Sequence, residues 1–187
     1  MRSATRFFKY LPFIAGLALA LWMAETAFAH LSDGRKWANP TVTFYIGGGP
    51  ESVPVNWKQQ YRDSAQTWTN APGSFALVET SPTSAQRNFG ARHFSQDPAF
   101  PDSWYGITLL TGQGTITSAS SYLNLDYSWN TDGTQFPDVR TVATHELGHW
   151  VFFIDNCSPQ KLVMCATGQI KWKLTKHEKN ELQQLYP

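Results

Sequence analysis

The stretch VATHELGHWVFFIDNC, Val142 to Cys157, limits what this chain can fold into more than any other segment. His145 and His149 are four residues apart within an apolar surround, a spacing typical of an α-helix. Residues four apart lie one above the other on a helix, so both imidazoles would face one point in space. Glu146 would lie about 100° further round the helix.

These residue types in this order indicate the chemistry of a zinc hydrolase. Two imidazoles can hold Zn²⁺, and the glutamate between them can act as a general base toward water without being a ligand itself. A catalytic zinc needs three protein ligands and one open position. Two other interpretations remain, an exported zinc-binding recognition or inhibitory module and a buried helix without any metal. Glu146 favours an enzyme, because a pure binding module has no use for a base.

Three carboxylates compete for the place of the third ligand. Asp155 follows His149 by six residues, which works if the helix ends just after His149 and the chain bends back under the metal. Glu178 and Glu181 are the alternatives, supplied by a second helix. Glu178 already has the spacing of a capping box with Thr175, a local role at a helix start. We therefore expect Asp155 to be the ligand, with both glutamates left open.

Residues 1–29 have the three parts of an export signal. Three basic residues come first, an apolar run covers Leu11–Ala24, and residues 27–29 form a small-x-small cleavage site. The apolar run is shorter than the roughly 20 residues of a membrane-spanning helix, so a membrane anchor is the weaker alternative. The sequence predicts a secreted, extracytoplasmic protein that begins at His30 and has no stable membrane anchor.

The charge balance excludes some classes of partner. Removing residues 1–29 takes away three of the 15 basic and one of the 14 acidic residues, which leaves 12 against 13. Such a balance argues against nucleic acid or an anionic membrane as partner. The remaining 158 residues are enough for one core. We expect one domain over residues 30–187, a monomer that acts on a protein or peptide substrate.

Two cysteines, Cys157 and Cys165, follow the histidine motif closely. In an exported chain such a pair usually forms a disulfide, which would close a small loop here. Two free thiols and zinc ligation by thiolates are the weaker alternatives, since two cysteines at this spacing form no recognised zinc finger.

Hydrophobic patterns predict an α+β fold, a mixed sheet with a helix packed on it. Strands are expected at Thr41–Gly47, Phe75–Thr80, Trp104–Leu110 and Thr115–Trp129. One helix starts near Ser52 with Trp57, Tyr61, Ala65 and Trp68 on one face, and a last helix runs from Thr175 to Tyr186. Ser81–Ser103, which contains three prolines, is expected to be mostly loop, and Asn130–Asp138 a turn-rich linker before the histidine helix.

Three segments, HELGHWVFFID, LVMCATG and LTKHEKNELQQLY, together resemble the metzincin clan of zinc endopeptidases, in particular matrixins and the small bacterial snapalysins. KWANPTVTFYI and SSYLNLDYSW are similar to the first strand of a matrixin catalytic domain and to the strand before its linker. The resemblance thus touches most of the mature chain. It implies a metzincin-like zincin domain, a twisted mixed β-sheet with a backing helix, an active-site helix and a C-terminal helix.

The resemblance also implies roles for individual residues. Asp155 stands at the position of the third zinc ligand, and Met164 at that of the methionine turn beneath the metal, although its spacing alone equally fits a core methionine. One catalytic zinc is implied, with Glu146 as the base. The substrate would lie extended along an edge strand formed by Tyr105, Gly106, Ile107, Thr108, Leu109 and Leu110.

At two positions the chain departs from the family pattern. Phe152 stands where the family has the glycine that lets the chain leave the helix. A phenylalanine resists the left-handed conformation, so we expect the turn to shift to Asn156 or to use another geometry. Cys165 stands where many members have tyrosine, so help to the transition state is not expected there.

Four aspartates in turn-rich segments could hold a structural Ca²⁺. They follow no regular calcium-loop pattern, so solvated turn residues are the simpler interpretation. These residues are Asp97, Asp102, Asp126 and Asp132.

Overall fold

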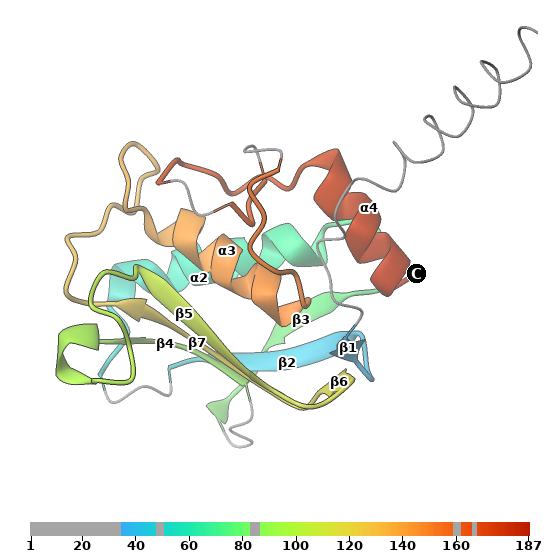
Figure 1. Ribbon diagram of the computed structural model, residues 1–187, viewed down its shortest axis with the longest axis horizontal. Coiled ribbons are helices and arrows are strands. Elements are labelled where there is room, and N and C mark those ends of the chain that lie inside the picture. Colours follow the sequence, from blue (N-terminus) through green and yellow to red (C-terminus); the bar gives the residue numbers. More distant parts are fainter. Residues whose placement is uncertain (1–34, 48–50, 83–86, 159–161, 166–167) are drawn as a thin grey trace, which may run out of the picture. The chain divides into compact units, whose positions relative to one another are not determined.

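A mixed β-sheet and the helices on one of its faces make up the computed structural model, which describes residues 35–47, 51–82, 87–158, 162–165 and 168–187 (Figure 1). The predicted export signal, residues 1–29, lies outside the described residues. None of the described helices has both the length and the apolar character needed to cross a bilayer.

The first half of the sheet is a strand–helix–strand unit, as the sequence predicts. β2, Thr41–Ile46, buries Val42 and Phe44 and exposes the alternating Thr41 and Thr43. α2, Val55–Thr69, begins directly after Pro54 and returns the chain to β3, Ala76–Glu79, which pairs parallel to β2. A parallel pair needs such a crossover, and a helix supplies it.

α2 and α3, Val139–Trp150, lie side by side on the same face of the sheet (Figure 1). Trp57, Tyr61, Ala65 and Trp68 form the buried face of α2, as predicted. The Trp68 indole N–H donates to the Thr144 carbonyl at 2.8 Å, and the Ser64 hydroxyl bonds α3 at Arg140 and Thr144. Satisfying these polar groups lets large aromatic side chains pack in the core, where they stabilise the helix pair.

The sequence prediction of a loop over Ser81–Ser103 is wrong in its centre. β4, Arg87–Arg92, lies inside the five-stranded sheet, whose order is β3-β2-β4-β7-β5. Phe89 and Ala91 are fully buried, while Gly90 lies against the Tyr122 ring of the neighbouring strand. The strand begins and ends with an arginine, so its sequence does not show the apolar alternation of a strand. Both arginines can pack in the fold because their guanidinium groups lie over aromatic rings, those of Trp37, Phe100 and Tyr122.

β5, Gly106–Thr111, forms one edge of the sheet and pairs antiparallel to β7, Ser118–Asn124. β7 ends at Asn124, five residues before the predicted end at Trp129. The buried Asn124 side-chain amide forms hydrogen bonds with backbone groups of four residues, Phe94, Asp102, Trp104 and Asp126. Beyond β7 this side chain therefore satisfies backbone groups that strand pairing would otherwise satisfy. A small parallel pair, β1, Lys36–Trp37, with β6, Thr115–Ile116, adjoins the connection between β5 and β7.

The last part of the chain agrees with its prediction. Asn130–Asp138 forms turns and leads into α3, and α4, Lys176–Leu185, starts with the predicted capping box of Thr175 and Glu178. A short 3₁₀ turn, η2, Phe94–Gln96, completes the described elements. The α+β class is therefore confirmed.

Candidate metal centre

α3 carries both histidines, and Asp138 fixes where it begins. The fully buried Asp138 side chain accepts hydrogen bonds from the N–H and the hydroxyl of Thr141, each 2.7 Å long. A carboxylate at this position satisfies free N–H groups and faces the positive end of the helix dipole. The cap therefore sets the phase of the helix and with it the direction of His145 and His149.

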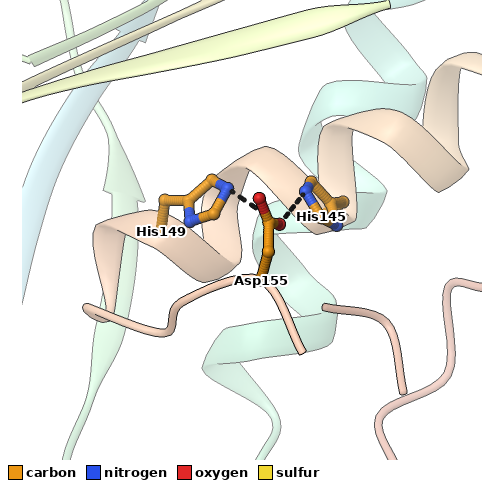
Figure 2. Close-up of side chains that lie close together, drawn as sticks. All are labelled: His145, His149 and Asp155. Carbon is orange, nitrogen blue, oxygen red and sulfur yellow. Dashed lines mark ion pairs between the residues drawn. The ribbon is translucent and has the colours of Figure 1, made fainter. Parts of the chain in front are cut away.

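His145, His149 and Asp155 come together at one point (Figure 2). Oδ1 of Asp155 lies 3.1 Å from Nε2 of His145 and 3.7 Å from Nε2 of His149. Their three ligand atoms all lie within 4.8 Å of one another. Within the part of the chain that the structure describes, this is the one group of three or more His, Cys, Asp or Glu side chains that could hold a metal ion.

Backbone carbonyls orient both imidazoles. Nδ1 of His145 lies 3.0 Å from the carbonyl oxygen of Val163, and Nδ1 of His149 lies 2.8 Å from that of Phe153. A carbonyl oxygen only accepts, so each Nδ1 must carry the proton. In the neutral ring this leaves the Nε2 lone pair directed at Asp155. Such outer hydrogen bonds are what fixes the tautomer of metal-binding histidines.

Phe152 itself makes the turn that brings Asp155 back to the helix. Its φ is +71°, and among the described residues it is the sole non-glycine with positive φ. The N–H of Phe152 donates to the His149 carbonyl at 2.9 Å, and that of Phe153 to the Gly148 carbonyl at 3.0 Å. These two bonds form a Schellman cap with Phe152 at the position that glycine usually occupies. The expectation that the turn would shift to Asn156 is therefore wrong.

Burial explains why a phenylalanine tolerates this position. The Phe152 side chain is only 3% exposed, and the Arg35 guanidinium lies 3.6 Å from the centre of its ring. A left-handed conformation costs about 1–2 kcal/mol for a residue with a Cβ, whereas full burial of a phenylalanine contributes about 1.5–3 kcal/mol. Packing of the ring thus offsets the strain.

Met164 packs against α3 at Gly148. Its sulfur contacts Gly148, the residue of α3 just before His149, so closely that a side chain there would overlap it. The Met164 carbonyl accepts from the N–H of Asn156 at 2.7 Å, which ties the Met164 segment to the residue after Asp155. Met164 is fully buried.

Glu178, an alternative third ligand, holds the Met164 segment instead. One of its carboxylate oxygens accepts from the N–H and hydroxyl of Thr175, and the other from the N–H of Met164 at 3.2 Å. Glu178 is fully buried at the start of α4. Neither Glu178 nor Glu181 belongs to the group of possible metal ligands. Sequence spacing revealed the capping box but not the bond to Met164.

Glu146 points from α3 toward the edge strand β5. Its side chain is 5% exposed, and Oε2 accepts a hydrogen bond from the Thr108 hydroxyl at 2.6 Å. A Cβ on Gly106 would lie 2.7 Å from Oε1 of Glu146, so the carboxylate occupies space that only glycine leaves. The sequence predicted a site role for Glu146 but not its contact with Thr108. The available signal was the pair of small residues, Gly106 and Thr108, at alternate positions of β5.

A cleft of about 710 Å³ opens over the site. His145, Glu146, His149 and Asp155 line it on one side, and Tyr105–Thr108 with Leu110 on the other. β5 has one neighbour in the sheet, so its other side is the sheet edge. The strand thus lies at the edge, as predicted, one residue shifted from the predicted range.

The disulfide is present between Cys157 and Cys165. It joins the segment just after Asp155 to the residue after Met164. The alternatives of free thiols and of thiolate ligands for zinc are therefore excluded for this pair.

The four aspartates considered for calcium lie apart from any such group in the described residues. Asp97 forms an ion pair with Arg92 at 2.7 Å, and Asp126 pairs with His93 at the same distance. A backbone hydrogen bond from Ser95, together with the contact with His93, lowers the pKa of Asp126. These contacts give calcium no support.

The three ligand groups also interact electrostatically. Burial works to lower the pKa of His145, but the hydrogen bond to Asp155 and the charge of Glu146 raise it to about 8. The hydrogen bond from His145 in turn lowers the pKa of Asp155. At neutral pH the pair thus shares a proton that a bound metal ion must displace.

Comparisons with known proteins add no assignment, since no family model matches the chain and no curated protein matches it significantly.

Proposed function

We propose that this chain is a secreted zinc-dependent endopeptidase of the metzincin type, acting on protein or peptide substrates. The observation that carries the proposal is the convergence of His145, His149 and Asp155, with both imidazoles oriented by carbonyls. A structural histidine does not require a carboxylate beside it, whereas here a left-handed turn at Phe152 brings Asp155 back to both histidines.

The donor set fits zinc. Two imidazole nitrogens and one carboxylate oxygen are ligand types that Zn²⁺ accepts, and three protein ligands leave the open position of a catalytic site. His145, His149 and Asp155 would hold the ion. When bound, zinc polarises the scissile carbonyl and lowers the pKa of water toward about 7. The carbonyls of Val163 and Phe153, which lie within hydrogen-bonding distance of Nδ1 of the two histidines, would keep both imidazoles in place.

Glu146 would act as the general base. It accepts the proton of the attacking water and passes it to the leaving amine. The carboxylate is buried in the wall of the cleft, beside but not among the metal ligands. A zinc-binding module without catalysis would not need a buried acid at this place.

The edge of β5 would bind the substrate. An extended peptide can add to a free sheet edge through backbone hydrogen bonds, while its side chains enter the adjoining cleft. The cleft lies between this strand and α3, so the peptide would pass directly over the histidines. Export of the protein is supported by the disulfide, which persists in oxidising compartments.

The test is cleavage of casein by the zinc-loaded wild type and by Glu146→Gln. We expect the variant to keep its zinc and to lose at least about 100-fold in cleavage rate, the usual contribution of a general base. Glu79→Gln, which alters an exposed acid on β3, is the matched control and should cleave normally. Zinc binding without cleavage by the wild type would instead identify a binding module.

A further inference from the structure

A chain of hydrogen bonds runs from the core of the protein to Glu146. The Trp150 indole N–H donates to Oγ of Ser121 at 2.7 Å, Oγ of Ser121 lies 2.6 Å from Oγ1 of Thr108, and Thr108 donates to Oε2 of Glu146 at 2.6 Å. Trp150 and Ser121 are fully buried. The chain crosses three elements, from α3 through β7 and β5 back to α3.

The direction of every bond in this chain follows from its two ends. An indole nitrogen only donates, and an ionised carboxylate only accepts. Each hydroxyl has one hydrogen to give. With Glu146 ionised, Ser121 must therefore accept from Trp150 and donate to Thr108, and Thr108 must donate to Glu146. The arrangement satisfies the hydrogen-bonding groups of all four side chains.

The same threonine hydroxyl also lies against the backbone of the helix. Its hydroxyl oxygen lies 3.1 Å from the main-chain carbonyl oxygen of Glu146. Gly106, two residues earlier on the same face of β5, leaves the space that the carboxylate fills. The strand that would bind the peptide thus fixes both the position and the orientation of the base.

We propose that Thr108, oriented by Ser121 and Trp150, is a positioning residue that holds the Glu146 carboxylate for proton transfer. The inference rests on the proposed endopeptidase function and deepens it. Because the Thr108 hydroxyl holds Oε2, the other carboxylate oxygen, Oε1, is left to take the proton. A base held in one geometry needs no reorganisation during the reaction, and small displacements of catalytic groups cost large factors in rate.

Thr108→Val keeps the shape of the side chain and removes its hydroxyl. We expect kcat for a quenched fluorescent peptide to fall at least about tenfold with KM within about twofold, because the base is misplaced while the strand remains. Thr108→Ser restores the hydroxyl and should recover most of kcat. Thr67→Val on α2, whose hydroxyl donates to the carbonyl of Asp63 away from the cleft, is the matched control and should leave both constants unchanged.

If Thr108 only braced the edge strand, Thr108→Val would raise KM and leave kcat unchanged, and this result would overturn the proposal. So would a Thr108→Ser variant as slow as Thr108→Val.

A second measurement does not depend on activity. Thr108→Val should lower the melting temperature of the zinc-free protein by about 4 °C, as expected for a lost hydrogen bond to a charged group. The same change in a Glu146→Ala background should lower it by less than half as much, since the carboxylate is gone. Equal shifts in both backgrounds would contradict the hydrogen bond. An inactive wild type would overturn the proposed function, and this cycle would still decide whether Thr108 holds the carboxylate.

Discussion

Phe152 shows how one side chain can replace the glycine of a helix cap. Its backbone is left-handed, yet its ring is buried and covered by Arg35. The backbone strain lowers the free energy of unfolding and the burial of the ring raises it, and substitutions of Phe152 can measure the two contributions separately.

Phe152→Ala keeps the strain and loses the buried ring, so it should lower the free energy of unfolding by about 3–5 kcal/mol. Phe152→Gly also loses the ring but relieves the strain, which recovers about 1 kcal/mol. Urea denaturation should therefore rank the wild type above the glycine variant and the glycine variant above the alanine variant. An alanine variant as stable as the glycine variant would show that Phe152 is not strained.

Asp155→Ala tests the third ligand. Removing one of three ligands should weaken zinc binding by about 100-fold or more, since loss of an outer-shell partner alone costs 10–100-fold. Competition with a chromophoric chelator measures this. Asp126→Ala, which removes an aspartate paired with His93, is the control and should bind zinc normally. Undiminished binding by Asp155→Ala would show that Asp155 is not a ligand.

Spacing alone predicted that His145, His149 and Asp155 would lie together, because the two histidines depend only on helical geometry and the aspartate on where the helix ends. Thr108 and the cap at Phe152 could not be predicted in this way. Their roles depend on contacts between segments far apart in the sequence, β5 with α3 and Arg35 with the turn.

Most elements can be predicted from local sequence signals such as alternation in strands, and amphipathic faces and caps in helices. This holds for β2, β3, α2, α3 and α4. It does not hold for β4. Its core residues, Phe89 and Ala91, stand among arginine, asparagine and glycine, and its place in the sheet comes from its two neighbours, β2 and β7. Aromatic rings cover its arginines, a tertiary effect that no local pattern displays.

The disulfide between Cys157 and Cys165 and the hydrogen bond from the Asn156 N–H to the Met164 carbonyl join the residues just after Asp155 to Met164 and Cys165. Replacing both cysteines by serine should lower the free energy of unfolding by about 2 kcal/mol, as for a small closed loop. It should also weaken zinc binding by about tenfold, because Asp155 must then be ordered as the ion binds. Chemical denaturation and zinc titration of the double variant measure the two effects. A loss of stability with unchanged zinc affinity would show that the disulfide stabilises the fold but does not help to order Asp155 for zinc binding.

At the scale of the whole molecule, the sheet and the helix layer meet at the candidate site. α3 carries His145, His149 and Glu146, β5 supplies the cleft edge and Thr108, and α4 contacts the backbone of Met164 through Glu178. Metal binding should therefore stabilise the entire fold.

This coupling has a pH dependence of known sign. The pKa of His145 is raised from 6.5 to about 8 beside Asp155, so in the zinc-free protein the stabilisation from the protonated imidazole is fully present below about pH 6.5 and is lost as pH rises through about 8. Zinc needs the neutral imidazole, and its affinity should fall about tenfold for each pH unit below 8 on account of this proton. Scanning calorimetry should thus show a larger zinc-induced rise in melting temperature at pH 8 than at pH 6. An equal rise at both values would contradict proton displacement at His145.

The ligand set of the bound ion tests the account most directly. X-ray absorption of the zinc-loaded protein should show one zinc per chain with two imidazole nitrogens at about 2.0–2.1 Å, one carboxylate oxygen at about 2.0–2.2 Å and no sulfur. A protein that retains no zinc after loading, or an ion with sulfur ligands or a single imidazole, would contradict it.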